Sequence, residues 1–307
     1  MIIANPIYDV VFKYLLEDLE IARELLSAIL GEEIISLEIK PQETATETPA
    51  SSVSILRFDF KAVIKTNTGG SKKVLIELQK AKQVFDVMRF RRYLGDNYKK
   101  EDEVRADNGA IEKRPLPIVT IYFLGFPLDN IDNAVGKINR EYRDVITQEI
   151  INVKEDFVEL LTHDSYLIQI RKLQGKSRTK LERILQVFSP EYQTQDKHQM
   201  DFKGDVNEPL VKKIVDRLGR AIASDEIRDK MDVEDEIDRI FERELKKLAA
   251  EKDKVIAEKE QELVAKDQEL VAKDQELDKE RQRAEAESQK NEDLQKQIEE
   301  LKKQMKK

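Results

Sequence analysis

A seven-residue repeat in the C-terminal part of the chain constrains its fold more than any other sequence feature. The segment LVAKDQE at 263–269 recurs unchanged at 270–276, and the phase of the repeat continues on both sides. With Leu263 at heptad position a, most a positions are apolar, whereas the apolar d residues are Leu294 and Leu301. An apolar seam of this period is typical of a helix that pairs with another helix. Residues 249–307 are therefore predicted to form a long, charged, coiled-coil helix.

Two arrangements of this helix fit the repeat. Lysines and glutamates at most d positions weaken the seam, which favours a single helix surrounded by water. Asn291 at an a position favours a homodimer instead, because a buried asparagine pairs best with its symmetry mate in a parallel coiled coil. Pairs such as Glu262–Lys266 and Glu269–Lys273 stabilise the helix in either arrangement.

Composition excludes several kinds of chemistry. The sequence has no cysteine, which rules out disulfides, thiolate zinc sites and cysteine nucleophiles. Its two histidines, His163 and His198, are read as surface or loop residues and are assigned no chemistry. No apolar stretch is long enough to span a membrane, and the N-terminus lacks a secretory leader. We therefore expect a cytoplasmic protein without membrane contacts.

The head that precedes the tail has the pattern of an α/β domain of roughly 230 residues. Apolar residues recur at helical spacing over 7–30, and Gly31 can end that helix. Loop chemistry at 44–54 and a Thr/Asn/Gly turn at 66–70 separate the strands that follow. The predicted elements are strands at Ile34–Lys40, Ile55–Lys65 and Lys73–Lys80, a helix at Phe85–Tyr98, a buried strand at Leu116–Leu124, and mostly helices from 140 to 248.

Two carboxylates interrupt apolar strands in this head. Asp59 and Glu77 are costly there unless a charged group compensates them. A turn centred between Thr68 and Gly69 places Asp59 opposite a residue between Glu77 and Gln79. Strand alternation puts Lys61 on the face of Asp59, and Gln79 on the face of Glu77. Two close carboxylates without thiols suit Mg²⁺, or Mn²⁺ in its place, and such a site suits phosphodiester hydrolysis.

A simpler reading remains open for these two residues. Asp59 and Glu77 would then lie on the solvated face of a half-exposed hairpin, paired with Lys61 or Arg57. Such pairing is the commoner fate of carboxylates in strands.

The order of elements and motifs resembles the PD-(D/E)XK nucleases, and more narrowly the recombination-promoting nuclease/putative transposase family of bacteria. The resemblance covers residues 5–126. It rests on Asp9-Val-Val-Phe12-Lys13, Arg57-Phe-Asp59, Ile76-Glu77-Leu78-Gln79, and then Arg89 and Tyr93 on the following helix.

The resemblance implies a restriction-endonuclease-like core of helix, three strands, helix and strand over 1–126. A helical extension packed on the core would follow at 127–248, and the coiled-coil tail at 249–307. It also implies that Asp59, Glu77 and the Leu78 carbonyl bind magnesium, with Asp9 and Lys13 as accessory residues. Gln79 stands where the wider superfamily has lysine, so either Lys61 supplies the positive charge or activity is weak.

A basic stretch follows the third strand. Lys82, Arg89 and Arg92 lie within Lys80–Lys100, with Tyr93 among them, in a chain whose formal net charge is −8. Such a local basic surface favours contact with the DNA backbone. We therefore expect a magnesium-dependent DNA endonuclease of recombination or transposition that is dimeric through its tail. The alternative is a catalytically inactive nuclease fold that acts as an interaction protein through the coiled coil.

Overall fold

The computed structural model describes residues 1–39, 56–65, 71–81, 87–105, 109–153 and 155–304. The chain forms two compact units, Met1–Arg239 and Ile240–Lys307. The first unit is an α/β domain built on a mixed six-stranded sheet, and the second is helical, so the predicted α/β head and long C-terminal helix are confirmed.

The strand order in the main sheet is β2-β3-β4-β7-β9-β8. Strands β2, β3 and β4 pair in an antiparallel manner, β7 runs parallel to β4 and β9, and β8 is antiparallel to β9. The strands are β2 Ile34–Ile39, β3 Leu56–Lys65, β4 Ser71–Ala81, β7 Ile118–Leu124, β8 Val135–Ile138 and β9 Asp164–Gln169.

Helices flank this sheet in the predicted order. Helices α1 (Asp9–Leu16) and α2 (Leu19–Leu30) precede β2, and α3 (Val87–Tyr98) follows β4. Asp18 caps the start of α2 by accepting backbone N–H bonds, and Gly31 ends it in the left-handed conformation, at φ 70°. The predicted loop at 44–54 and turn at 66–70 lie outside the described residues.

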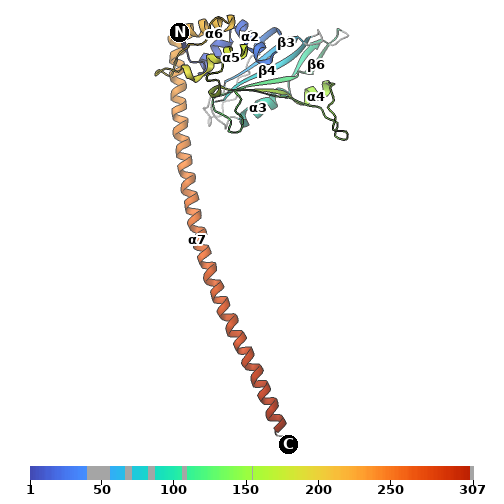
Figure 1. The fold of residues 1–307 in the computed structure, drawn as a ribbon, viewed down its shortest axis with the longest axis vertical. Coiled ribbons are helices and arrows are strands. Elements are labelled where there is room, and N and C mark those ends of the chain that lie inside the picture. Colours follow the sequence, from blue (N-terminus) through green and yellow to red (C-terminus); the bar gives the residue numbers. More distant parts are fainter. Residues whose placement is uncertain (40–55, 66–70, 82–86, 106–108, 154, 305–307) are drawn as a thin grey trace. The chain divides into compact units, whose positions relative to one another are not determined.

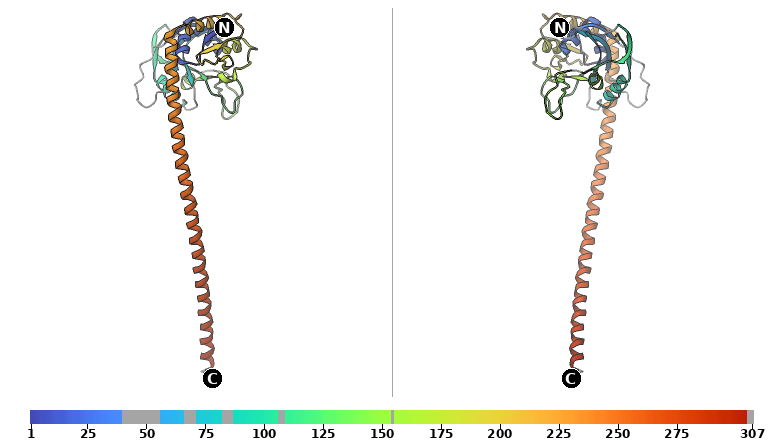
Figure 2. Two further views of the ribbon diagram at one scale, coloured as in Figure 1. Left: turned by 90° about the vertical axis from the view of Figure 1, so that its left-hand side faces the viewer. Right: turned by 90° about the vertical axis from the view of Figure 1, so that its right-hand side faces the viewer.

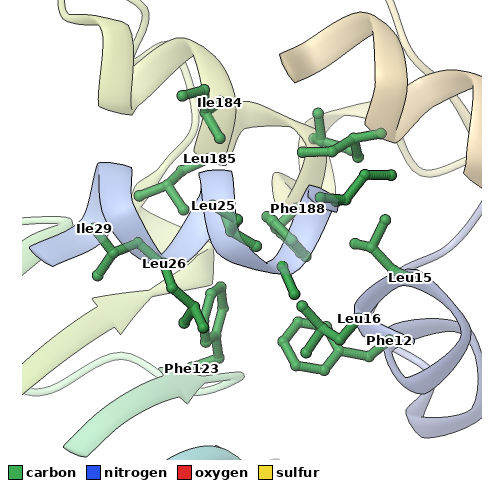
Figure 3. Close-up of a cluster of buried hydrophobic side chains, with 14 of the residues drawn as sticks. Phe12, Leu15, Leu16, Leu25, Leu26, Ile29, Phe123, Ile184, Leu185 and Phe188 are labelled. Atoms are coloured by element: carbon green, nitrogen blue, oxygen red, sulfur yellow. The ribbon is translucent and has the colours of Figure 1, made fainter. Parts of the chain in front are cut away.

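One face of the sheet, here called the core face, packs on helices α1, α2, α5 (Lys180–Leu185) and α6 (Pro209–Ile222). Phe12 of α1, Phe123 of β7 and Phe188 of the 3₁₀ turn η3 (Gln186–Phe188) pack edge to face or tilted, with ring centroids 5.2–5.8 Å apart. Figure 3 shows these rings among leucines and isoleucines of α1, α2 and α5. Burial of this cluster is the main stabilising term of the first unit.

The opposite face of the sheet, here called the second face, carries polar residues beside apolar ones. Helix α3 lies on this side in Figure 1, whereas α2, α5 and α6 lie on the other. The Tyr98 hydroxyl at the end of α3 is 2.7 Å from His163 Nδ1, just before β9, and Asn97 is buried. These contacts attach α3 to the sheet.

The expectation of a mostly helical extension over 127–248 needs correction. Strands β8 and β9 belong to the main sheet, and β10 (Gln199–Asp201) pairs with β1 (Ile2–Ala4). Strand β9 is largely buried on both faces, so its sequence lacks the period-two alternation of a half-exposed strand. The helices of this region are α4 (Asp156–Leu161), α5, α6 and the start of α7, with 3₁₀ turns at η2 (Ile170–Lys172), η3 and η4 (Pro190–Tyr192).

A two-stranded hairpin between α3 and β7 has no counterpart in the sequence prediction. It consists of β5 (Glu101–Arg105) and β6 (Ile111–Pro115), which pair with each other in a separate sheet. Strand β6 is exposed over most of its length. The hairpin therefore attaches to the main sheet through side chains rather than through strand pairing.

Helix α7 (Asp225–Gln304) carries the heptad repeat, and Figure 2 shows it as continuous from two further directions. Its first turns belong to the first unit, which ends at Arg239 rather than at the predicted boundary of 248. In the second unit the a residues Leu263, Leu270 and Leu277 are exposed. Lys273 bonds Glu269 at 2.7 Å as predicted, whereas Glu262 bonds Lys259 and not the predicted Lys266. Among the described helices, none has the length and apolar character needed to cross a membrane.

Candidate functional site

The register of β3 and β4 places Asp59 directly opposite Glu77. This pairing lies within the range predicted from the hairpin turn. Directly opposed residues of an antiparallel pair share one face of the sheet, so the two carboxylate positions are neighbours on the second face. The next pairs on that face are Arg57 with Gln79 and Lys61 with Leu75.

The same row continues onto two parallel strands. Glu77 pairs with Thr120 of β7, and Thr120 pairs with Ser165 of β9. Thr120 is fully buried and Ser165 is 7% exposed, and their hydroxyl oxygens are 2.8 Å apart. A row of polar positions therefore crosses four strands, from Asp59 to Ser165.

For several predicted site residues the structure describes only the backbone. The side chains of Asp59, Glu77, Leu78 and Gln79, and those of Arg89, Arg92 and Tyr93 on α3, lie outside the description, as does the whole of Lys82. Among the side chains that are described, no cluster of three or more His, Asp or Glu residues could hold a metal ion. The donor types at the Asp59–Glu77 pair, two carboxylates beside a strand carbonyl, fit a hard cation such as Mg²⁺.

Lys61 has a carboxylate partner outside the predicted pair. Its ammonium nitrogen lies 2.5 Å from Asp102 Oδ2 on β5, and the other oxygen of Asp102 is 3.3 Å from Lys73 Nζ on β4. Burial tends to raise the pKa of Asp102, but the hydrogen bonds from Lys61 and Lys73 outweigh that effect and lower it. Asp102 is therefore ionised at neutral pH and bridges two lysines on the second face.

Asp9 and Lys13 do not join this site. Both lie on α1, whose Phe12 packs against Phe123 on the core face. The backbone N–H of Asp9 donates to both carboxylate oxygens of Glu234 on α7, at 2.8 and 3.0 Å. The predicted accessory residues are thus on the opposite side of the sheet from Asp59.

Both histidines lie in loops, as the sequence interpretation allowed, but neither is a plain surface residue. His163 is half-buried against Tyr98, and burial followed by the nearby Arg140 charge lowers its pKa. The His198 side chain is 12% exposed, and its Nε2 lies 3.2 Å from Asp235 Oδ2 on α7. His163 therefore helps to attach α3 to the sheet, and His198 helps to attach the first turns of α7 to the head.

A partly buried ion-pair network lies at the start of β9, next to the polar row. Arg140 contacts Glu159 of α4 at 2.9 Å and Asp164 of β9 at 3.0 Å, and the three side chains are 16%, 14% and 21% exposed. The Tyr142 hydroxyl donates to the other oxygen of Glu159. These residues line a cavity of about 380 Å³ beside β8. All the polar groups named here have partners, so we interpret the network as one that stabilises the fold.

Sequence reasoning missed the Thr120–Ser165 pair and Asp102. The register places Arg57 opposite Gln79, because their numbers share the sum of Asp59 and Glu77. Thr120 and Asp102 carried no such local signal, since their positions depend on the parallel pairing of β7 and on the β5–β6 hairpin.

A scan against protein-family models found no match for this chain, and searches of curated proteins and of solved structures found none either.

Proposed function

We propose that this protein is a magnesium-dependent DNA endonuclease whose site is the Asp59–Glu77 pair on the second face. The observation that carries the proposal is the direct pairing of these two positions in β3 and β4. Two carboxylates on adjacent strands repel each other unless a cation lies between them.

The order of elements gives independent support. A helix precedes three antiparallel strands, and a helix on the second face leads to a fourth strand parallel to the third. This is the order expected of a restriction-endonuclease-like core, with the acidic pair on its second and third strands. The β5–β6 hairpin and strands β8 and β9 are additions to that order.

Each residue of the site then has a distinct task. Asp59, Glu77 and the Leu78 carbonyl would hold the ion, which when bound activates water and offsets charge on the phosphate. Lys61 and Arg57 flank the pair on the same face and supply the positive charge that the amide of Gln79 lacks. Arg89, Arg92 and Tyr93 belong to α3, on the same side of the sheet, and are assigned to the DNA backbone.

A homodimer formed by the tail would bring two such heads to one duplex, which suits a role in recombination or transposition. The exposed a residues of the tail also support a second candidate, an interaction protein that has lost catalysis. The two candidate functions differ in whether the protein cleaves DNA.

Cleavage of supercoiled plasmid with Mg²⁺ tests the proposal. The wild type should produce nicked and linear DNA that chelation of Mg²⁺ abolishes. Asp59→Asn should lower the rate about a hundredfold or more, whereas Glu33→Gln, an exposed carboxylate paired with Lys65, should leave it unchanged. Equal rates for the wild type and Asp59→Asn would reject the proposal and favour the interaction protein.

A further inference from the structure

Asp102 occupies a position between two lysines of the main sheet. One of its oxygens contacts Lys61 Nζ at 2.5 Å, and the other contacts Lys73 Nζ at 3.3 Å. Asp102 is 14% exposed, and the two lysines are 26% and 30% exposed. The backbone N–H of Glu103 also donates to Asp102, at 2.8 Å, and its carbonyl accepts from Lys73. The carboxylate is thus held by three donors in a partly buried place.

The hairpin that carries Asp102 contacts the main sheet through side chains. Strands β5 and β6 pair with each other and with no strand of the main sheet among those described. Asp102 joins this hairpin to β3 and β4 through its ion pairs with Lys61 and Lys73. Both lysines keep part of their surface in water, so a competing anion that accepts from the same ammonium groups can reach them and replace the carboxylate.

The two lysines have the right chemistry for such an anion. A carboxylate and a phosphodiester each present two oxygens that share one negative charge, and each can accept from two ammonium groups. Lys61 and Lys73 carry two positive charges against the single charge of Asp102. Lys61 is two residues from Asp59 on the same face, about 6.6 Å along the strand.

We infer that Lys61 and Lys73 form a binding subsite for a DNA backbone phosphate, and that Asp102 occupies this subsite in the free protein. The inference rests on the proposed function, because it takes the anion to be the substrate of the Asp59–Glu77 site. Binding of DNA exchanges the Asp102 carboxylate for a phosphate. Lys73 holds the backbone beside the acidic pair and takes no part in breaking the bond, whereas Lys61 serves both the subsite and the acidic pair.

Duplex binding without divalent metal tests this inference apart from cleavage. Fluorescence anisotropy of a labelled duplex in chelator gives the affinity at several salt concentrations for the full chain. Asp102→Asn frees both lysines, so it should raise the affinity about tenfold and steepen the slope of log affinity against log salt by about 1. Glu112→Gln removes the same charge from an exposed position on β6. This variant should change the affinity by less than about twofold and leave the salt slope as it is in the wild type.

A second pair of variants keeps the test decisive if Asp102→Asn loosens the hairpin. Lys73→Ala should weaken duplex binding several-fold and make the salt slope shallower, whereas Lys203→Ala, at a 73% exposed residue outside the basic stretch, should have a smaller effect. Equal effects of Asp102→Asn and Glu112→Gln, or equal effects of the two lysine variants, would overturn the subsite. A wild type that fails to cleave while Asp102→Asn still gains affinity would reject the nuclease and keep the subsite.

Discussion

Asp59 of β3 and Glu77 of β4 are direct partners in the antiparallel register, on the face of the sheet opposite the hydrophobic core. A sheet gains nothing in stability from two opposed carboxylates, because like charges directly across a strand pair destabilise it. The pair therefore calls for a positive group. Lys61, the nearest described cation on that strand and face, is paired with Asp102.

Replacement of Lys61 should impair cleavage selectively. Lys61→Ala removes a charge-assisted contact to the phosphate, worth about 1.5 to 3 kcal/mol, so the cleavage rate should fall about tenfold to a hundredfold. Lys65→Ala is the matched control, because Lys65 lies on the same strand and face but is 55% exposed and pairs with Glu33. Plasmid cleavage rates compare the two variants, and equal losses would remove Lys61 from the site.

The Arg140 network should support the stability of the head. Arg140→Ala leaves Glu159 and Asp164 without their shared cation in a partly buried place, so the free energy of unfolding should fall by about 2 kcal/mol. Arg143→Ala, at a 45% exposed arginine of the same segment, should change it by less than about 0.5 kcal/mol. Urea denaturation measures both, and a similar loss in the two variants would contradict a structural role for the network.

His163 should make stability depend on pH. Because burial and then Arg140 lower its pKa in the folded head, the unfolded chain binds more protons between that lowered pKa and the ordinary value of 6.5. The contribution is complete above about pH 6.5 and is lost as the pH falls toward the folded-state pKa. Urea denaturation at about pH 7.5 and about pH 5.5 should therefore show a smaller fall for His163→Gln than for the wild type. An unchanged fall would mean that His163 is not held neutral.

The tail should associate without stabilising the head. Leu294 and Leu301 are the apolar d residues, so replacing both with Lys should shift the full chain toward monomer while thermal unfolding of the head stays nearly unchanged. Sedimentation equilibrium of the full chain, the double variant and a truncation after Leu248 measures this. A truncated head that remains a dimer, or a full chain that is monomeric at micromolar concentration, would leave the tail as a solitary helix.

Local sequence patterns predicted the part of the site that depends on local geometry. The hairpin between β3 and β4 joins strands that are close in sequence, so its turn residues determine which residues face each other. The capping of α2 by Gly31 and the helix at 87–98 follow from equally local signals.

The remainder of the site depends on contacts between distant segments. Ser165 joins the polar row because β9 inserts between β7 and β8, and its buried sequence could equally belong to a helix. Asp102 reaches Lys61 because a separate hairpin lies against β3 and β4. The position of that hairpin cannot be predicted from residue spacing in the sequence.

Calorimetric titration with Mn²⁺ tests most directly whether Asp59 and Glu77 share a cation. The wild-type head should bind one or two ions, and both Asp59→Asn and Glu77→Gln should abolish or greatly weaken that binding, because each removes half of the carboxylate pair. Glu33→Gln, at an exposed carboxylate with its own lysine partner, should bind as the wild type does. Unchanged Mn²⁺ binding by Asp59→Asn and Glu77→Gln would show that the pair is not a metal site.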